Sequence, residues 1–188
     1  MRVVVLHGSP RRGGNSDTLA EHFVNGVKQT GEFEVLDFVL NDMNIRPCQG
    51  CESCAGAEEH KCVIDDDMHK IYSVFADADI VVWATPMYWG YMTAQMKIAL
   101  DRMESLAMDP EKYWVDKEFV AILTYRYHYQ STIGFFERVQ DYFRFKFSSI
   151  LYCSKNETGP EDFHVTSDKE KLEEAYNLGM RLGIKIVV

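Results

Sequence analysis

Five short, mainly apolar segments flanked by turn residues are spread along the chain. They cover residues 2–7, 33–38, 79–85, 118–124 and 148–153. Three of these runs are continuously apolar, which is typical of a parallel strand covered by helices on both faces. The pattern therefore predicts a sheet with a buried interior.

Helical patterns separate these segments, at residues 15–31, 65–78, 93–106, 131–145 and 167–186. In the first of them Leu19, Phe23 and Val27 recur at a four-residue spacing, and Gly31 is the expected C-terminal cap. Alternating strands and helices with right-handed crossovers give a doubly wound α/β sheet. We expect a flavodoxin-like fold with five parallel strands in the order 2-1-3-4-5, in a single domain over residues 1–188.

A cysteine-rich insert, residues 41–65, interrupts the alternation. It lies between the second predicted strand and the next predicted helix. Long loops inside compact domains are usually functional, so we expect this insert to carry part of the chemistry.

Composition narrows the possible partners. The chain has 188 residues and a net charge of −9, and an acidic surface disfavours nucleic acid. The first apolar run is too short for a signal peptide or a membrane span. We therefore expect a cytoplasmic protein with no membrane partner, in which clustered cysteines are metal ligands or redox thiols.

The loop after the first strand, HGSPRRGGNSDT at residues 7–18, has the composition of an anion site. Its glycines allow unusual backbone dihedrals, its arginines supply charge, and the following helix N-terminus supplies amides. Hydroxyl or amide donors are Ser9, Asn15, Ser16 and Thr18. The loop lacks the lysine of an ATP-binding P-loop, so we expect it to bind a monophosphate. The alternative is a polar turn with Asn15 or Ser16 as a helix cap.

The loop after the third strand is rich in aromatic residues. Met87, Tyr88, Trp89 and Tyr91 follow Pro86, and Gly90 permits close backbone approach. Aromatic side chains at the carboxyl edge of a sheet can flank a flat ring. For Tyr91 and Met92 a role in the core or in a dimer contact is an equal alternative. A phosphate loop and an aromatic loop together describe a site for FMN.

With both loops considered, the sequence resembles the flavodoxin-like NAD(P)H-dependent FMN reductases and, within them, the iron–sulfur flavoproteins. The motifs GSPRRGGNS, PCQGCESC…KCVIDDDM and ATPMYWGYMTAQMKIALDR carry this resemblance over residues 1 to 105. It implies that Ser9, Arg11, Asn15 and Ser16 hold the FMN phosphate. It assigns Pro86, Met87, Tyr88, Trp89 and Gly90 to the flavin ring, with Thr124 and Tyr125 also touching the flavin. The stretch TYRYHYQSTIG replaces a glycine-rich loop of the family and leaves the substrate side undefined.

The resemblance implies an FMN-dependent oxidoreductase that forms a homodimer or homotetramer. Electrons would come from NAD(P)H or reduced ferredoxin and pass to a small acceptor such as a quinone or O₂, the flavin carrying the chemistry. The alternative is a flavodoxin-like electron carrier or redox sensor without a substrate of its own.

Four cysteines in the insert, Cys48, Cys51, Cys54 and Cys62, have the spacing C-x2-C-x2-C-x7-C. Successive CxxC steps with a more distant fourth thiolate are the ferredoxin-like grip on a [4Fe–4S] cluster, which we expect here. Zinc and free or redox thiols are alternatives. We expect the insert to reach the flavin edge of this chain or of a neighbouring subunit. The fifth cysteine, Cys153, is expected to be a small buried hydrophobe.

Overall fold

A computed structural model describes residues 1–55, 62–158 and 162–187 of the chain. The strands are Arg2–His7 (β1), Glu34–Val39 (β2), Ile80–Tyr88 (β3), Tyr91–Met92 (β4), Glu118–Tyr125 (β5) and Lys146–Cys153 (β6). Five of them run parallel in the order β2-β1-β3-β5-β6, and the short β4 pairs with β3 in antiparallel orientation. The predicted flavodoxin-like order is confirmed.

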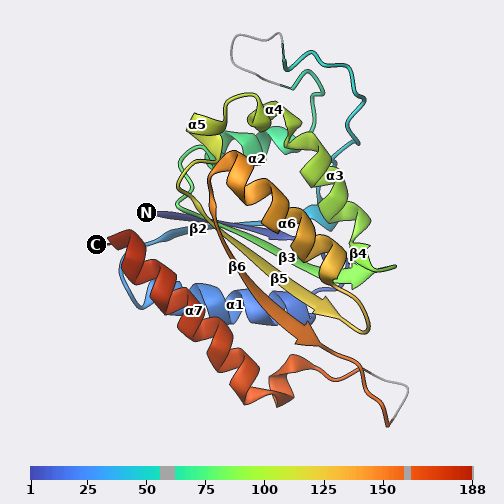
Figure 1. Ribbon diagram of the computed structural model, residues 1–188, viewed down its shortest axis with the longest axis vertical. Helices are drawn as coiled ribbons and strands as arrows, with labels where there is room; N and C mark the ends of the chain where they lie inside the picture. Colours follow the sequence, from blue (N-terminus) through green and yellow to red (C-terminus); the bar gives the residue numbers. More distant parts are fainter. Residues whose placement is uncertain (56–61, 159–161, 188) are drawn as a thin grey trace.

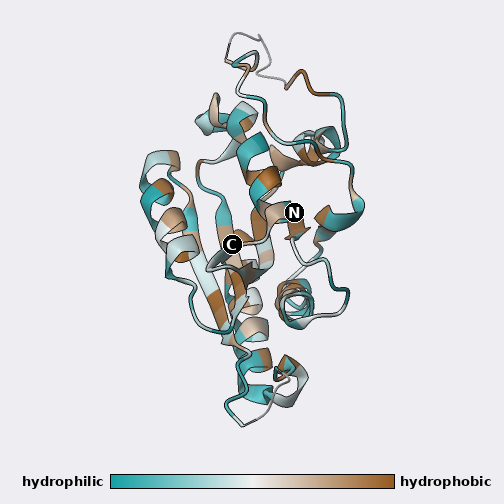
Figure 2. Ribbon diagram, turned by 90° about the vertical axis from the view of Figure 1, so that its right-hand side faces the viewer, coloured by the Kyte–Doolittle hydropathy of each residue, from teal (hydrophilic) through white to brown (hydrophobic). Residues whose placement is uncertain are grey.

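Helices cover both faces of this sheet (Figure 1). The α-helices are Asn15–Lys28 (α1), Met68–Phe75 (α2), Ala94–Arg102 (α3), Glu104–Ala107 (α4), Pro110–Tyr113 (α5), Gln130–Phe143 (α6) and Lys169–Val187 (α7). Two 3-10 turns are Leu40–Asp42 (η1) and Val165–Ser167 (η2). One core cluster lies between the sheet and α1 with α7, and the other between the sheet and α2, α3 and α6. The helices are amphipathic and show both brown and teal segments (Figure 2).

Helices α1 and α7 contact each other backbone to backbone. A Cβ atom added to Gly26 would lie 2.0 Å from the carbonyl oxygen of Tyr176, and one on Gly179 would lie 2.0 Å from that of Phe23. These distances are far below van der Waals contact, so only glycine allows the two helices to pack this closely. The contact fixes the position of α1, whose N-terminus faces the carboxyl edge of the sheet.

Some sequence expectations are corrected here. Helix α1 ends at Lys28, and the C-cap is Gln29 in right-handed conformation, so the expected capping role of Gly31 is wrong. The expected helix 93–106 is divided at Met103 into α3 and α4. Cys153, expected to be buried, is exposed, and it is the last residue of the edge strand β6. Within the three described ranges, no helix is long and apolar enough to cross a membrane.

Candidate functional site at the carboxyl edge of the sheet

The loop between β1 and α1 is held close to the start of α3. The amide of Gly8 donates to the carbonyl oxygen of Ala84 at 2.8 Å, and the hydroxyl of Thr93 donates to the carbonyl oxygen of Gly8 at 2.7 Å. A Cβ atom on Gly8 would lie 3.0 Å from Met96 and from Thr85. These contacts therefore fix the start of the β1–α1 loop against the end of β3, which leads into the aromatic loop, and against the start of α3.

Helix α1 begins without a side-chain cap. Gly14 occupies the N-cap position, so the alternative in which Asn15 or Ser16 caps the helix is wrong. An uncapped N-terminus presents backbone amides and the positive end of the helix dipole, which together favour a phosphate. Nearby, the backbone amide of Arg11 donates to the Ser9 hydroxyl oxygen at 3.0 Å, which shapes the turn.

The two arginines of this loop have different surroundings. Arg12 forms an ion pair with Asp42. No residue in the described ranges forms a hydrogen bond or ion pair with the guanidinium of Arg11, which is exposed and lines the cavity described below. Arg11 is therefore the cation available to a bound anion.

His7 connects the end of β1 to this loop. Its Nδ1 lies 3.1 Å from Asp17 and its Nε2 lies 3.0 Å from Asp37, while Asp17 also accepts a hydrogen bond from the amide of Gly13 at 3.0 Å. Burial opposes the charge on His7, but the two carboxylates raise its pKa to about 9. The imidazolium thus holds Asp17 where it fixes Gly13, which has a left-handed φ of +63°. These contacts give His7 a structural role.

The aromatic loop is a β-hairpin with a two-residue turn. Tyr88 pairs with Tyr91, and the two residues between them, Trp89 and Gly90, have φ values of +52° and +75°. Positive φ at both positions is the conformation of a type I′ turn, which tolerates glycine easily and tryptophan poorly. Trp89 is fully exposed at the tip, and Ser131 on α6 donates to the carbonyl oxygen of Gly90.

A cavity of about 510 Å³ joins these loops at the carboxyl edge of the sheet. This volume is within the range of small-molecule and cofactor sites, ~300–1,000 Å³. The cavity contains nine of the predicted residues: Ser9, Arg11, Asn15, Ser16, Pro86, Met87, Tyr88, Thr124 and Tyr125. The structure thus brings the predicted phosphate loop and ring loop to one cavity.

Three predicted residues lie elsewhere. Trp89 and Gly90 line a neighbouring cavity of about 600 Å³, together with Tyr127 and His128. The two cavities share Met87, Tyr88 and Arg126. Thr18 lines neither of them, and its amide makes an ordinary helical hydrogen bond to Gly14.

A third wall of the 510 Å³ cavity was missed by sequence reasoning. It comes from Arg126, Ser154, Asp162, Phe163 and His164. The Asn15 side chain donates to the carbonyl oxygen of Phe163 at 3.1 Å and accepts from the amide of Val165 at 2.8 Å. Asn15 therefore binds the segment before α7 through its side chain. This wall could have been predicted only from the position of that segment after the last strand, because ligands bind beyond the carboxyl ends of parallel strands.

Hydrogen bonds hold the two ends of the insert together. The amide of Asn44 donates to Asp67 at 2.7 Å, and the amide of Arg46 donates to Asp66 at 2.9 Å. Asp66 in turn pairs with Arg102 at the end of α3 at 2.6 Å. Asp66 also accepts a hydrogen bond from the amide of Met68, the first residue of α2, at 3.1 Å.

The four cysteines of the insert are not gathered into a cage. No group of three or more histidine, cysteine, aspartate or glutamate side chains within residues 1–55, 62–158 and 162–187 could hold a metal ion. Burial raises the pKa of Cys54, and charges at Cys62, Glu104 and Cys48 act in the same direction. The thiols thus influence one another, but their placement does not fit a cluster.

The described residues of the insert do not line the 510 Å³ cavity, although Asp42 at its start pairs with Arg12 of the cavity wall. Figure 1 shows that the insert begins beside the sheet, runs along α3 and continues to the region beyond α3 and α4. The tip of the insert includes residues 56–61, which lie outside the described residues, so the expectation that it reaches the flavin edge of the same chain stays a prediction. The alternative, contact with a neighbouring subunit, stays a prediction.

Comparisons with known proteins found one matching family and several named relatives. The model of the family of NADPH-dependent FMN reductases matches residues 1–133. An iron-sulfur flavoprotein of Methanocaldococcus jannaschii is 36% identical over 106 residues, 56% of this chain and 53% of the relative. One of Archaeoglobus fulgidus is 35% identical over 120 residues, 64% of this chain and 60% of the relative. The matches thus span little more than half the length of these relatives.

The fold has solved counterparts. An NAD(P)H:quinone oxidoreductase from Methanothermobacter marburgensis superposes with a TM-score of 0.63 at 18% identity, covering 97% of this chain and 98% of its own. At this identity the likeness shows the fold alone.

Proposed function

The chain belongs to the family of NADPH-dependent FMN reductases, and on this premise we propose that it is an FMN-dependent oxidoreductase. The observation that supports this most strongly is the single cavity shared by the β1–α1 loop and the β3–β4 hairpin. Bound FMN would supply transfer of a hydride or of single electrons between a donor and an acceptor.

The residues of the cavity fit the two ends of FMN. The unpaired Arg11 guanidinium and the uncapped amides of α1 would hold the phosphate. Pro86, Met87 and Tyr88 would contact the ring from one wall, with Thr124 and Tyr125 from another. The protein's part is to bind and orient the flavin, and no side chain needs to act as acid or base.

We infer that the donor and the acceptor approach through the neighbouring cavity. It shares Met87 and Tyr88 with the FMN cavity and opens beside Tyr127 and His128. NAD(P)H is the proposed donor, with reduced ferredoxin as an alternative, and a quinone or O₂ is the proposed acceptor. The family's name supports NADPH as the donor.

Anaerobic reduction followed by an acceptor tests this proposal. FMN-loaded protein should lose its visible flavin absorbance when NADH, NADPH or reduced ferredoxin is added, and should regain it with a quinone or O₂ over many turnovers. Reduction without turnover would favour the electron carrier. Failure of every donor would contradict the oxidoreductase.

The [4Fe–4S] cluster remains a separate proposal for Cys48, Cys51, Cys54 and Cys62. Their spacing and the names of the iron-sulfur flavoprotein relatives support it, whereas their placement requires the loop to rearrange. Anaerobically prepared protein should hold about four irons and four sulfides per chain, and Cys54→Ser should lose them. The control is Cys153→Ser, outside the insert. Zinc, or unmodified thiols after reconstitution, would contradict the cluster.

A further inference from the structure

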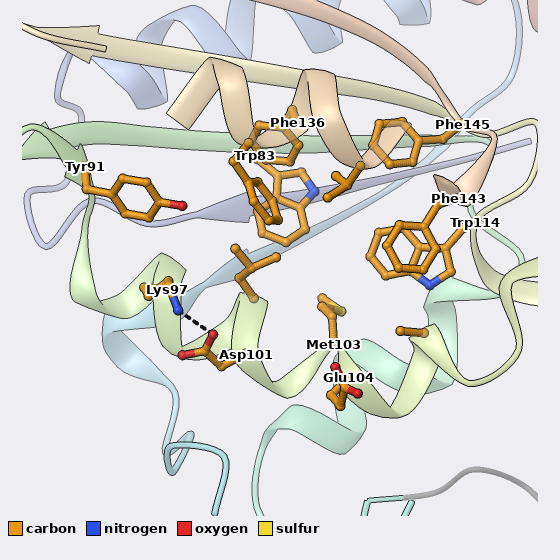
Figure 3. A pocket seen from close by; sticks show the side chains of 14 residues that line it. Trp83, Tyr91, Lys97, Asp101, Met103, Glu104, Trp114, Phe136, Phe143 and Phe145 are labelled. Atoms are coloured by element: carbon orange, nitrogen blue, oxygen red, sulfur yellow. Dashed lines mark hydrogen bonds and ion pairs between the residues drawn. The ribbon is translucent and has the colours of Figure 1, made fainter. Parts of the chain in front are cut away.

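Two more cavities lie outside the proposed FMN site. One, of about 270 Å³ between α3, α4 and α6, is lined mainly by aromatic rings, and the lysine in its wall, Lys97, is paired with Asp101 (Figure 3). The other, of about 500 Å³, lies between α1 and β2 and contains His7. It shares Arg12 and Gly13 with the 510 Å³ cavity, so the phosphate loop forms the wall between the two. A charged group in the 500 Å³ cavity can therefore act on the phosphate loop from its other side.

Both ring nitrogens of His7 face carboxylates. Nδ1 lies 3.1 Å from Asp17 on α1, and Nε2 lies 3.0 Å from Asp37 on β2. An ionised carboxylate only accepts hydrogen bonds, and a neutral imidazole has a single N–H. Only the imidazolium can donate to both carboxylates, so these two contacts indicate that His7 is protonated in this arrangement.

The other charged groups around His7 favour its protonated form. On its β3 side His7 pairs with Ala84, which carries no charge. The charged residues that line the 500 Å³ cavity with it are Asp17, Glu21 and Lys28 on α1, Asp37 on β2 and Arg12 on the phosphate loop. Three carboxylates thus face two cations, and Arg12 is already paired with Asp42. Loss of the His7 proton would therefore leave an excess of negative charge beside the phosphate loop.

Asp17 connects this charge balance to the backbone of the phosphate loop. Its second carboxylate oxygen accepts a hydrogen bond from the amide of Gly13 at 3.0 Å, and Gly13 has a φ of +63°. The carbonyl oxygen of Gly13 lies 3.2 Å from Nε2 of His164, which lines the 510 Å³ cavity. Gly13 is thus held through both of its backbone polar groups, and one of these contacts depends on the position of Asp17.

We propose that His7 is a positioning residue for the phosphate of FMN, acting through Asp17 and Gly13, and that its deprotonation weakens FMN binding. This inference rests on the proposed function, because it takes the β1–α1 loop as the phosphate site. A neutral His7 can donate to only one of its two carboxylates, and the uncompensated negative charge repels the phosphate. Riboflavin has no phosphate, so its binding should not depend on His7 in this way.

The ratio of FMN affinity to riboflavin affinity, measured by flavin fluorescence from about pH 7.5 to pH 10, tests this inference. A phosphate monoester is a dianion throughout this range, and the ratio cancels any titration of the shared ring. Burial lowers the pKa of His7, but Asp17 and Asp37 raise it to about 9. The ratio should therefore fall by about fivefold or more as the pH rises through 9.

Three variants identify the titrating group. In His7→Gln the ratio should already be low at pH 7.5 and should stay constant. Asp37→Asn removes one carboxylate that raises the pKa of His7, so the fall should move to lower pH, and this variant serves if His7→Gln does not fold. His22→Gln is the matched control, because His22 lies on α1 but lines neither cavity, and its profile should equal that of the parent protein.

Reciprocity provides a second readout. If the protonation of His7 strengthens FMN binding, bound FMN must raise the pKa of His7 by the same factor. The ring-proton signals of His7 in NMR spectra should thus titrate at higher pH in the FMN complex than in the riboflavin complex. A ratio that is constant with pH in the parent protein, or that falls unchanged in His7→Gln or Asp37→Asn, would overturn the inference and leave the proposed function intact. No preference for FMN over riboflavin at about pH 7.5 would overturn both.

Discussion

The guanidinium of Arg102 lies 2.6 Å from the carboxylate of Asp66, and neither side chain is accessible to solvent. Arg102 also donates to the carbonyl oxygen of Arg46 at 2.8 Å, so it contacts the chain segments at both ends of the cysteine insert. Tyr72 closes the arrangement by donating to the carbonyl oxygen of Arg102 at 2.6 Å. The insert is therefore anchored to the end of α3, whatever its cysteines bind.

Removing one partner of this pair should destabilise the protein strongly. Asp66→Ala leaves the Arg102 charge buried and uncompensated, which costs about 3–5 kcal/mol. Urea unfolding at pH 7 measures the difference. The matched control is Asp65→Ala, an exposed neighbour, which should change the free energy of unfolding by less than about 0.5 kcal/mol. Equal effects of the two variants would contradict the anchor.

The same pair predicts sensitivity to acid. Burial disfavours the charge on Asp66, but hydrogen bonds from Arg102 and from the amides of Arg46 and Met68 hold its pKa below the ordinary value. A lowered folded pKa stabilises the protein above the ordinary pKa of about 4, and this contribution is lost as the pH falls through the lowered value. Asp66→Ala should therefore differ less from the parent protein in acid than at pH 7. A difference that stays constant down to acid unfolding would count against the ion pair.

Substitution by alanine should affect stability differently at two helical glycines, one at the contact between α1 and α7 and one in α6. Gly179→Ala places a methyl group 2.0 Å from a carbonyl oxygen of α1, so the helices must separate, at a cost of at least about 1–3 kcal/mol. In α6, Gly134→Ala meets only the flexible side chain of Arg138 at 3.4 Å. That variant should be neutral or gain about 0.5–1 kcal/mol from helix propensity. Thermal and urea unfolding of the two variants test this, and a tolerated Gly179→Ala would mean that the helices do not pack this closely.

His7 predicts a dependence on alkaline pH. Its pKa is raised from 6.5 to about 9 by Asp17 and Asp37 against the cost of burial, so its contribution to stability is complete below pH 6.5 and is lost as the pH rises through 9. His7→Gln should cost on the order of 1–3 kcal/mol at pH 6 and much less at pH 9.5. Urea unfolding at several pH values measures this. A cost that does not change with pH would assign His7 a packing role only.

Local patterns predicted the sheet and the starting points of the site. The bounds of β1 were predicted directly, because the four apolar residues from Val3 to Leu6 lie between polar residues and a turn, which leaves few alternatives. The phosphate loop and the ring loop were found because each follows a strand, and parallel strands end at a common edge. Glycine positions predicted the helix ends less well. The glycines between α1 and α7 are required by the close packing of the two helices and not by a left-handed cap.

Contacts between distant segments could not be read in the same way. Asn15 and Phe163 are 148 positions apart, and no local pattern announces their hydrogen bond. Nor does any local pattern indicate that Asp66 is buried against an arginine 36 positions away. The spacing of the cysteines indicated a ligand type and not a location, and only the position of the insert after the second strand suggested that its tip reaches the flavin edge.

The central claim is that the β1–α1 loop holds the phosphate of FMN through Arg11. Titration of the protein with FMN and with riboflavin, followed by flavin fluorescence, tests it most directly. FMN should bind more tightly, and Arg11→Gln should weaken FMN by about 1.5–3 kcal/mol without changing riboflavin. Arg12→Gln is the matched control, since Arg12 is already paired with Asp42, and it should change FMN affinity little. Equal affinity for FMN and riboflavin, or equal losses in both arginine variants, would contradict the claim.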